Sequence, residues 1–91
     1  MKFAVEVGDV EKNRLEYYSN QLLGSTTIKI NDTPVKHVVR LVNEPVLEVH
    51  SFLIGNREKT AVRIEKQRRP LLGYTNRVYV NGRLAGVFRG L

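Results

Sequence analysis

The chain has 91 residues and no cysteine; 42% of its residues are hydrophobic and 26% are charged, and its net charge is +6. A chain of this length forms one domain around a single core, and its ordinary composition excludes a disordered or low-complexity protein. The lack of cysteine excludes a disulfide scaffold and thiolate zinc ligands, so we expect a cytoplasmic protein. Nowhere do about 18 consecutive apolar residues occur, and the first residues lack a signal-peptide run, so we expect no membrane-spanning segment.

Four strands are predicted in the first half, because apolar and polar residues alternate there with the period of two that half-buried strands show. In the second of these strands Leu15 and Tyr17 point inward, whereas Arg14 and Glu16 point outward. Gly, Asn, Asp and Pro separate the strands, as is typical of turns. The predicted strands are residues 2–7, 13–18, 26–31 and 35–42.

The second half repeats the pattern. In its second strand Val62 and Ile64 point inward and alternate with outward Arg63 and Glu65. Two residues that accept positive φ, Asn-Gly at 81–82, predict a type I′ hairpin turn. The predicted strands are residues 46–54, 60–66, 74–80 and 83–88.

Short segments recur in the same order in both halves: "GDVEK" at 8–12 and "GNREK" at 55–59, then "LLG" at 22–24 and 71–73. We interpret the first pair as turns in which glycine supplies positive φ while Glu and Lys are solvated. The repeats predict a single domain over 1–91, with units at about 2–42 and 46–89. The expected fold is an all-β, antiparallel β-sandwich of about eight strands from a duplicated four-strand unit; a barrel is the less favoured alternative.

This arrangement of strands and turns resembles the Fas apoptotic inhibitory molecule family. The matching segments are "RLEYY" at 14–18, "TIKIND" at 27–32 and "YTNRVYVNG" at 74–82. The resemblance implies a cytosolic, non-enzymatic β-sandwich that acts by contacting other proteins. It supplies no catalytic residues.

The residues that could carry catalysis show no catalytic pattern, so we expect a protein that is not an enzyme. His37 and His50 stand in separate strands, where sheet-face positions are more usual than metal ligands, so we expect no metal and no cofactor. The serines lack a nucleophile-elbow pattern. Four glutamates alternate with basic residues or open turns and are interpreted as solvated sheet surface: Glu6, Glu11, Glu16 and Glu48.

The excess positive charge lies entirely in the second half. Residues 1–50 carry a net charge of −1 and residues 51–91 carry +7. We expect Arg63 and Arg77 on the outer face of neighbouring strands beside Tyr79, with Arg68 and Arg69 capping the hairpin. The candidate binding residues are Arg63, Lys66, Arg68, Arg69, Arg77 and Tyr79.

Three interpretations of this basic face stay open: a merely solvated sheet face, a surface for an acidic protein partner, or a nucleic-acid surface on which Tyr79 stacks with a base. The predicted function is a non-catalytic interaction domain that binds a protein partner through the arginine-rich face of its second half. The alternative is binding of nucleic acid or another polyanion through the same face.

Overall fold

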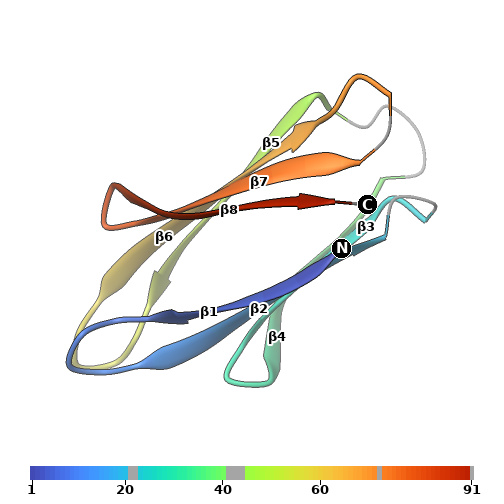
Figure 1. The fold of residues 1–91 in the computed structure, drawn as a ribbon. Helices are drawn as coiled ribbons and strands as arrows, with labels where there is room; N and C mark the ends of the chain where they lie inside the picture. The colour runs from blue at the N-terminus through green and yellow to red at the C-terminus, as the bar shows by residue number, and fades with distance from the viewer. Residues whose placement is uncertain (21–22, 41–44, 72, 91) are drawn as a thin grey trace.

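In the computed structural model, which describes residues 1–20, 23–40, 45–71 and 73–90, the protein is an all-β structure of two four-stranded antiparallel sheets (Figure 1). The first sheet has the order β1-β2-β3-β4 and the second the order β5-β6-β7-β8. The strands are β1 (Lys2–Val7), β2 (Asn13–Asn20), β3 (Ser25–Ile30), β4 (Thr33–Val39), β5 (Leu47–Ile54), β6 (Thr60–Arg68), β7 (Tyr74–Val80) and β8 (Arg83–Gly90). The predicted fold class is therefore confirmed. The described residues include no helix that could cross a membrane.

The strand boundaries differ most from prediction in β4, which begins at Thr33 and ends at Val39. Pro34 lies inside this strand, although the sequence suggested a turn there. An edge strand accepts proline because one side of its backbone needs no ladder hydrogen bond, and β4 is the edge of its sheet. Residues 41–42 of the predicted strand lie outside the described residues.

The turn after the third strand has the same contacts in both sheets. Asn31 and Asn81 both have positive φ and follow the third strand of their sheets. The side-chain oxygen of Asn31 accepts the Arg14 N–H at 2.9 Å, and that of Asn81 accepts the Ala61 N–H at 2.9 Å. Each of these two hairpins also carries an irregularity in register, between residues 28 and 29 and between residues 78 and 79. Equivalent positions in the two halves thus form equivalent contacts.

The apolar core lies between the sheets and is built from the inward residues predicted for both halves. Its fully buried members include Leu15, Tyr17, Ile28, Ile64 and Val78. Rings on the two edge strands β1 and β8 join the sheets.

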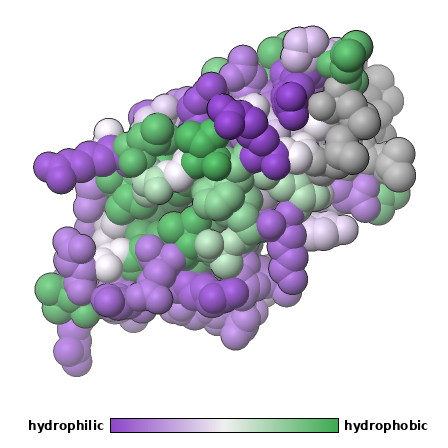
Figure 2. Space-filling model, viewed as in Figure 1, coloured by the Kyte–Doolittle hydropathy of each residue, from purple (hydrophilic) through white to green (hydrophobic). Residues whose placement is uncertain are grey.

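Phe3 of β1 stacks on Phe88 of β8 with ring centroids 4.0 Å apart. Figure 2 shows hydrophobic side chains gathered in the middle of the face where these edge strands lie, with hydrophilic side chains around them. Val5 and Phe88 are only partly buried, so the core reaches the surface along this side.

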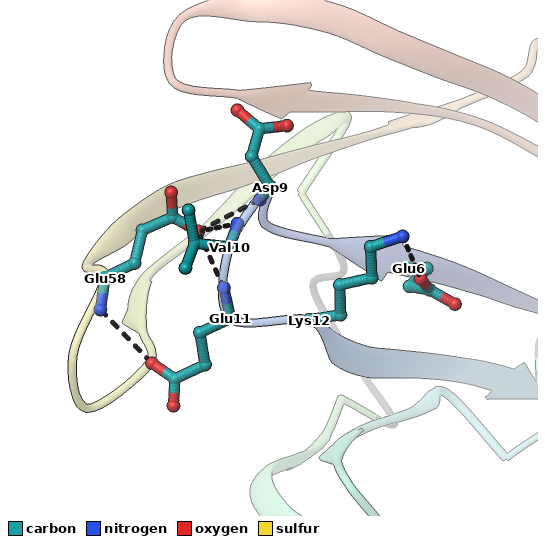
Figure 3. A network of polar contacts seen from close by, with 6 residues as sticks. All are labelled: Glu6, Asp9, Val10, Glu11, Lys12 and Glu58. Atoms are coloured by element: carbon teal, nitrogen blue, oxygen red, sulfur yellow. Dashed lines mark hydrogen bonds and ion pairs between the residues drawn. The ribbon is translucent and has the colours of Figure 1, made fainter.

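The β1–β2 and β5–β6 turns hold each other through two reciprocal glutamates (Figure 3). One carboxylate oxygen of Glu58 accepts three backbone N–H groups, those of Asp9 at 2.9 Å, Val10 at 3.1 Å and Glu11 at 3.3 Å. One carboxylate oxygen of Glu11 does the same for the opposite turn. Its donors are the backbone N–H groups of Asn56 at 2.7 Å, Arg57 at 2.9 Å and Glu58 at 3.2 Å.

We call residues 8–11 and 55–58 the turn clasp. The interpretation of these glutamates as solvated turn residues was incomplete: both stay partly exposed, but each also accepts hydrogen bonds from the backbone of the other repeat's turn. The N–H donors of residues 56–58, Arg57 first, hold the pKa of Glu11 below its ordinary value, since they stabilise the carboxylate.

We expect Glu11→Ala and Glu58→Ala to lower the melting temperature by similar amounts. Each removes the acceptor for three N–H groups and loosens the joint between the sheets. The control is Glu6→Ala. Glu6 only meets Lys12 at 3.6 Å in an exposed pair, which contributes little. Thermal unfolding followed by circular dichroism checks this, and a loss no larger than that of the control would contradict the role of the clasp.

Candidate functional site

Arg63 and Tyr79 form the centre of the outer face of the second sheet, the face made by the outward side chains of β5–β8. They are direct partners across β6 and β7, and the Arg63 guanidinium lies over the Tyr79 ring, 4.4 Å from its centroid. The Arg63 Nε also lies 3.1 Å from a carboxylate oxygen of Glu65. These contacts orient Arg63, yet its side chain stays 46% exposed.

Arg77 lies on the same face, opposite Glu65. It donates a hydrogen bond of 3.0 Å to the side-chain oxygen of Gln67. Arg63, Arg77 and Tyr79 are therefore side by side on neighbouring strands, as the sequence predicted.

Arg68 and Arg69 lie at the end of β6 and are exposed. The Arg68 backbone N–H donates to the carbonyl of Val46 at 2.7 Å, and the Arg69 N–H donates to the carbonyl of Gly73 at 3.0 Å. Both arginines thus lie where β6 leads into the β6–β7 turn, as predicted, but the alternation of β6 places Arg68 on the side of Lys66 and not on that of Arg63.

Lys66 does not belong to this face, which corrects the prediction. It is 4% exposed and points between the sheets, where its Nζ donates to the Thr26 hydroxyl at 3.0 Å. The physical reason is the period of two: Arg63 and Glu65 point outward, so Lys66 points inward with Ile64. The sequence suggested an outward Lys66 because it lies in the basic run with Arg68 and Arg69.

Apolar side chains also contribute to the outer face of the second sheet. Leu47, Val49 and Leu53 of β5 are 53%, 47% and 73% exposed. A hollow of about 400 Å³ includes Leu53, Arg63 and Tyr79 in its lining. The face thus combines arginine, tyrosine and aliphatic groups rather than presenting uniform positive charge.

A second group of polar residues, which the sequence analysis missed, lies inside the sandwich. We call it the polar rows: Ser19 and Thr26 are paired on the first sheet, and Glu48, Lys66 and Asn76 follow one another across the second. All five are buried. The Lys66–Thr26 hydrogen bond joins the two rows.

His50 lies beside the polar rows and is 1% exposed. Its Nε2 is 3.1 Å from a Glu48 oxygen, while the other Glu48 oxygen accepts the Arg40 Nε–H at 3.0 Å. Burial, followed by the charge of Lys36, lowers the pKa of His50 from 6.5 to about 4, against the opposing effect of Glu48. His50 is therefore neutral near pH 7.

The two histidines lie in different environments, one exposed and one buried. His37 is exposed on β4, where its Nδ1 lies 2.7 Å from the Thr27 hydroxyl, whereas His50 points inward from β5. The described ranges hold no group of three His, Cys, Asp or Glu residues placed to bind a metal ion.

The interpretation of Glu48 as solvated surface was wrong, because β5 reverses the usual pattern. Its polar residues Glu48 and His50 point inward, and Leu47 and Val49 point outward. The signal was present in the strand itself. Ile54 must face the core, and residues 48, 50, 52 and 54 share one face of a regular strand.

Comparisons with protein-family models, with curated proteins and with solved structures found no match to this chain.

Proposed function

We propose that this protein is a non-catalytic cytoplasmic interaction domain that binds a protein partner carrying acidic groups through the outer face of its second sheet. The observation that carries the proposal is the Arg63–Tyr79 pair, set beside Arg77 and exposed leucine and valine side chains. Arginine and aromatic residues are enriched at protein interfaces, and the best binding positions lie among apolar neighbours.

The contacts within the face favour protein over nucleic acid. One side of the Tyr79 ring is covered by the Arg63 guanidinium, which limits stacking with a base. Glu65 lies between Arg63 and Arg77 in the ladder and adds a negative charge where phosphates would pass. Leu53 and Val49 fit a protein surface better than a phosphate backbone.

The test is quantitative capture of partners from native lysate by the immobilised protein, with nuclease-treated and untreated arms. We expect Arg63→Ser combined with Arg77→Ser to reduce capture of the partner at least about tenfold in both arms, since arginines at such positions often dominate binding. The matched control is Arg14→Ser with Lys29→Ser, two exposed basic residues on the outer face of the first sheet. Equal capture by the two double variants would contradict the proposal.

Nucleic-acid binding is the second candidate because guanidinium groups and a tyrosine lie together. It predicts binding of mixed single-stranded oligonucleotides that weakens steeply with salt, as counterion release requires. Capture that disappears after nuclease treatment would favour this candidate over a protein partner.

A further inference from the structure

Four strands lie at the edges of the two sheets: β1, β4, β5 and β8. An edge strand exposes unpaired backbone N–H and C=O groups that can pair with another chain, so proteins usually protect it with charged residues, proline or a bulge. Three of the four strands carry such protection. β1 carries Lys2 and Glu6, β4 contains Pro34, and β8 carries Arg83 and Arg89. β4 and β8 also pair with their neighbours in an irregular register.

β5 is the edge strand that has none of these features. It pairs with β6 in an unbroken register over all of its residues. Its only titratable residues, Glu48 and His50, point inward and are buried. Its outward side chains are exposed and uncharged: Leu47, Val49, Ser51 and Leu53. β5 is therefore a regular, mostly apolar edge of the kind that pairs with another strand.

The backbone of the same outward residues faces the open side of the sheet. The Arg68 N–H donates to the Val46 carbonyl at 2.7 Å, and the register continues residue by residue from there. In an antiparallel pair alternate residues exchange hydrogen bonds, so residues 46, 48, 50, 52 and 54 bond to β6. Residues 47, 49, 51 and 53 thus direct their N–H and C=O groups away from β6, where the sheet has no further strand.

We propose that β5 pairs antiparallel with β5 of a second copy of this chain. The two second sheets then form one continuous sheet of eight strands around a two-fold axis. Pairing centred on His50 uses all four outward residues. Leu47 lies opposite Leu53 of the second copy, and Val49 lies opposite Ser51 of the second copy.

The charges of β5 are compatible with this self-pairing. Glu48 lies opposite Phe52 of the second copy, so the two carboxylates do not meet. His50 lies opposite itself, and it is neutral near pH 7. No like charges therefore oppose each other along the pair, whereas β8 would bring Arg83 and Arg89 to the same kind of contact.

The pairing goes beyond the proposed binding of an acidic partner and does not depend on it. The two-fold axis is perpendicular to the continuous sheet, so the dimer presents both Arg63–Tyr79 pairs on one surface. Val49 and Leu53 also belong to that outer face. The tests of the dimer therefore measure mass and backbone protection rather than partner capture, which keeps failure of one proposal distinct from failure of the other.

The first test is the mass of the intact protein in solution, measured by analytical ultracentrifugation at concentrations up to about 1 mM. We expect the mass to rise with concentration from one chain to two chains and to stop there, because pairing uses up the free edge of β5 in both copies. A single chain at every concentration, or growth beyond two chains, would overturn the proposal.

Hydrogen exchange of backbone amides, followed by NMR, shows which edge is used. We expect the N–H groups of residues 47, 49, 51 and 53 to exchange at least about tenfold more slowly in the dimer than in the monomer. Ala85 and Val87, whose N–H groups face away from β7 on the edge strand β8, should show no such change. A dimer without protection of β5 would overturn the proposal. Protection that requires a different protein would also overturn it and would assign the edge to a partner strand.

Two valines on edge strands provide matched variants. Val49 of β5 is 47% exposed, and Val39 at the end of β4 is 52% exposed. Val49→Lys places two lysines on neighbouring strands beside the two-fold axis, so we expect it to weaken dimerisation at least about tenfold, while Val39→Lys leaves it unchanged. Ser51→Pro removes an N–H that faces away from β6 and should abolish the dimer; should that variant not fold, Val49→Lys still decides. Equal dimerisation of the two lysine variants would overturn the proposal.

Discussion

Acidification from pH 6.5 to about 4 is expected to lower the free energy of unfolding by roughly 3 kcal/mol through His50 alone. The unfolded chain binds a proton at His50 below its ordinary pKa of 6.5, whereas the folded protein keeps the ring neutral down to a pKa of about 4. Between these values the unfolded state holds more protons. The free energy of unfolding therefore decreases as pH decreases, by about 1.4 kcal/mol per pH unit. Below about 4 both states are protonated and this contribution changes no further.

The cause is the surroundings of the ring. Burial removes water from His50, and three cations disfavour a further positive charge: Lys36 of β4, Arg40 directly after β4, and Lys66 of β6. Glu48 opposes them but is itself bound to Arg40. Protonation of His50 is therefore less favourable in the folded state than in the unfolded chain, where the ring keeps its ordinary pKa of 6.5.

Urea unfolding at a series of pH values measures this dependence. We expect His50→Leu to remove the slope between pH 6.5 and about 4, because leucine does not titrate. Leucine also suits the position, since His50 is the direct cross-strand partner of the core residue Ile64. His37→Asn is the control and should keep the slope, since His37 is exposed. Glu11 acts in a more acidic range, because its lowered pKa makes its contribution disappear only as pH falls below its ordinary 4.5. A wild-type slope that survives in His50→Leu would refute the assignment.

Replacing Gly55 by alanine is expected to lower the free energy of unfolding by about 3 kcal/mol. Gly55 has φ of +111°, and a Cβ there would overlap the backbone carbonyl oxygen of Glu58. It would also lie 3.0 Å from the Glu11 carboxylate, the group that binds this turn from the other sheet. The substitution therefore strains the turn and disturbs the turn clasp together.

Gly82→Ala is the matched control for the backbone strain. Gly82 also has positive φ, +80°, but a Cβ at this position meets nothing within 4 Å. We expect it to cost only about 1 kcal/mol, the strain of a left-handed conformation without a clash. Chemical unfolding of both variants checks the difference, and equal losses would show that the carbonyl and the clasp do not restrict residue 55.

Much of the fold could be predicted because local patterns decide it. The alternation around Leu15 and Ile64 defines which faces of β2 and β6 are buried, and the Asn-Gly pair at 81–82 defines a hairpin turn. The positions of Arg63, Arg77 and Tyr79 on one outer face follow from the same alternation. These properties depend on neighbours a few residues away, so a single sequence contains them.

The inward placement of polar residues depends on how the two sheets pack and was not predicted. Alternation separates the two faces of a strand, but it assigns polar residues to the outside by default. In β5 that default fails, because Phe52 and Ile54 bring Glu48 and His50 inward with them. Lys66 likewise looked like a member of a basic run until its strand placed it against Thr26.

The all-β class, the turns and the outer arginine face follow from backbone propensity and side-chain alternation, which act between near neighbours in the chain. The packing of the two sheets adds the binding of each turn by Glu11 or Glu58 of the other sheet and the gathering of polar residues beside His50. The turn clasp and the bond that joins the polar rows link residues 40 or more positions apart, such as Thr26 and Lys66 or Glu11 and Asn56. Their partners are set by how the two sheets pack, which no local pattern specifies.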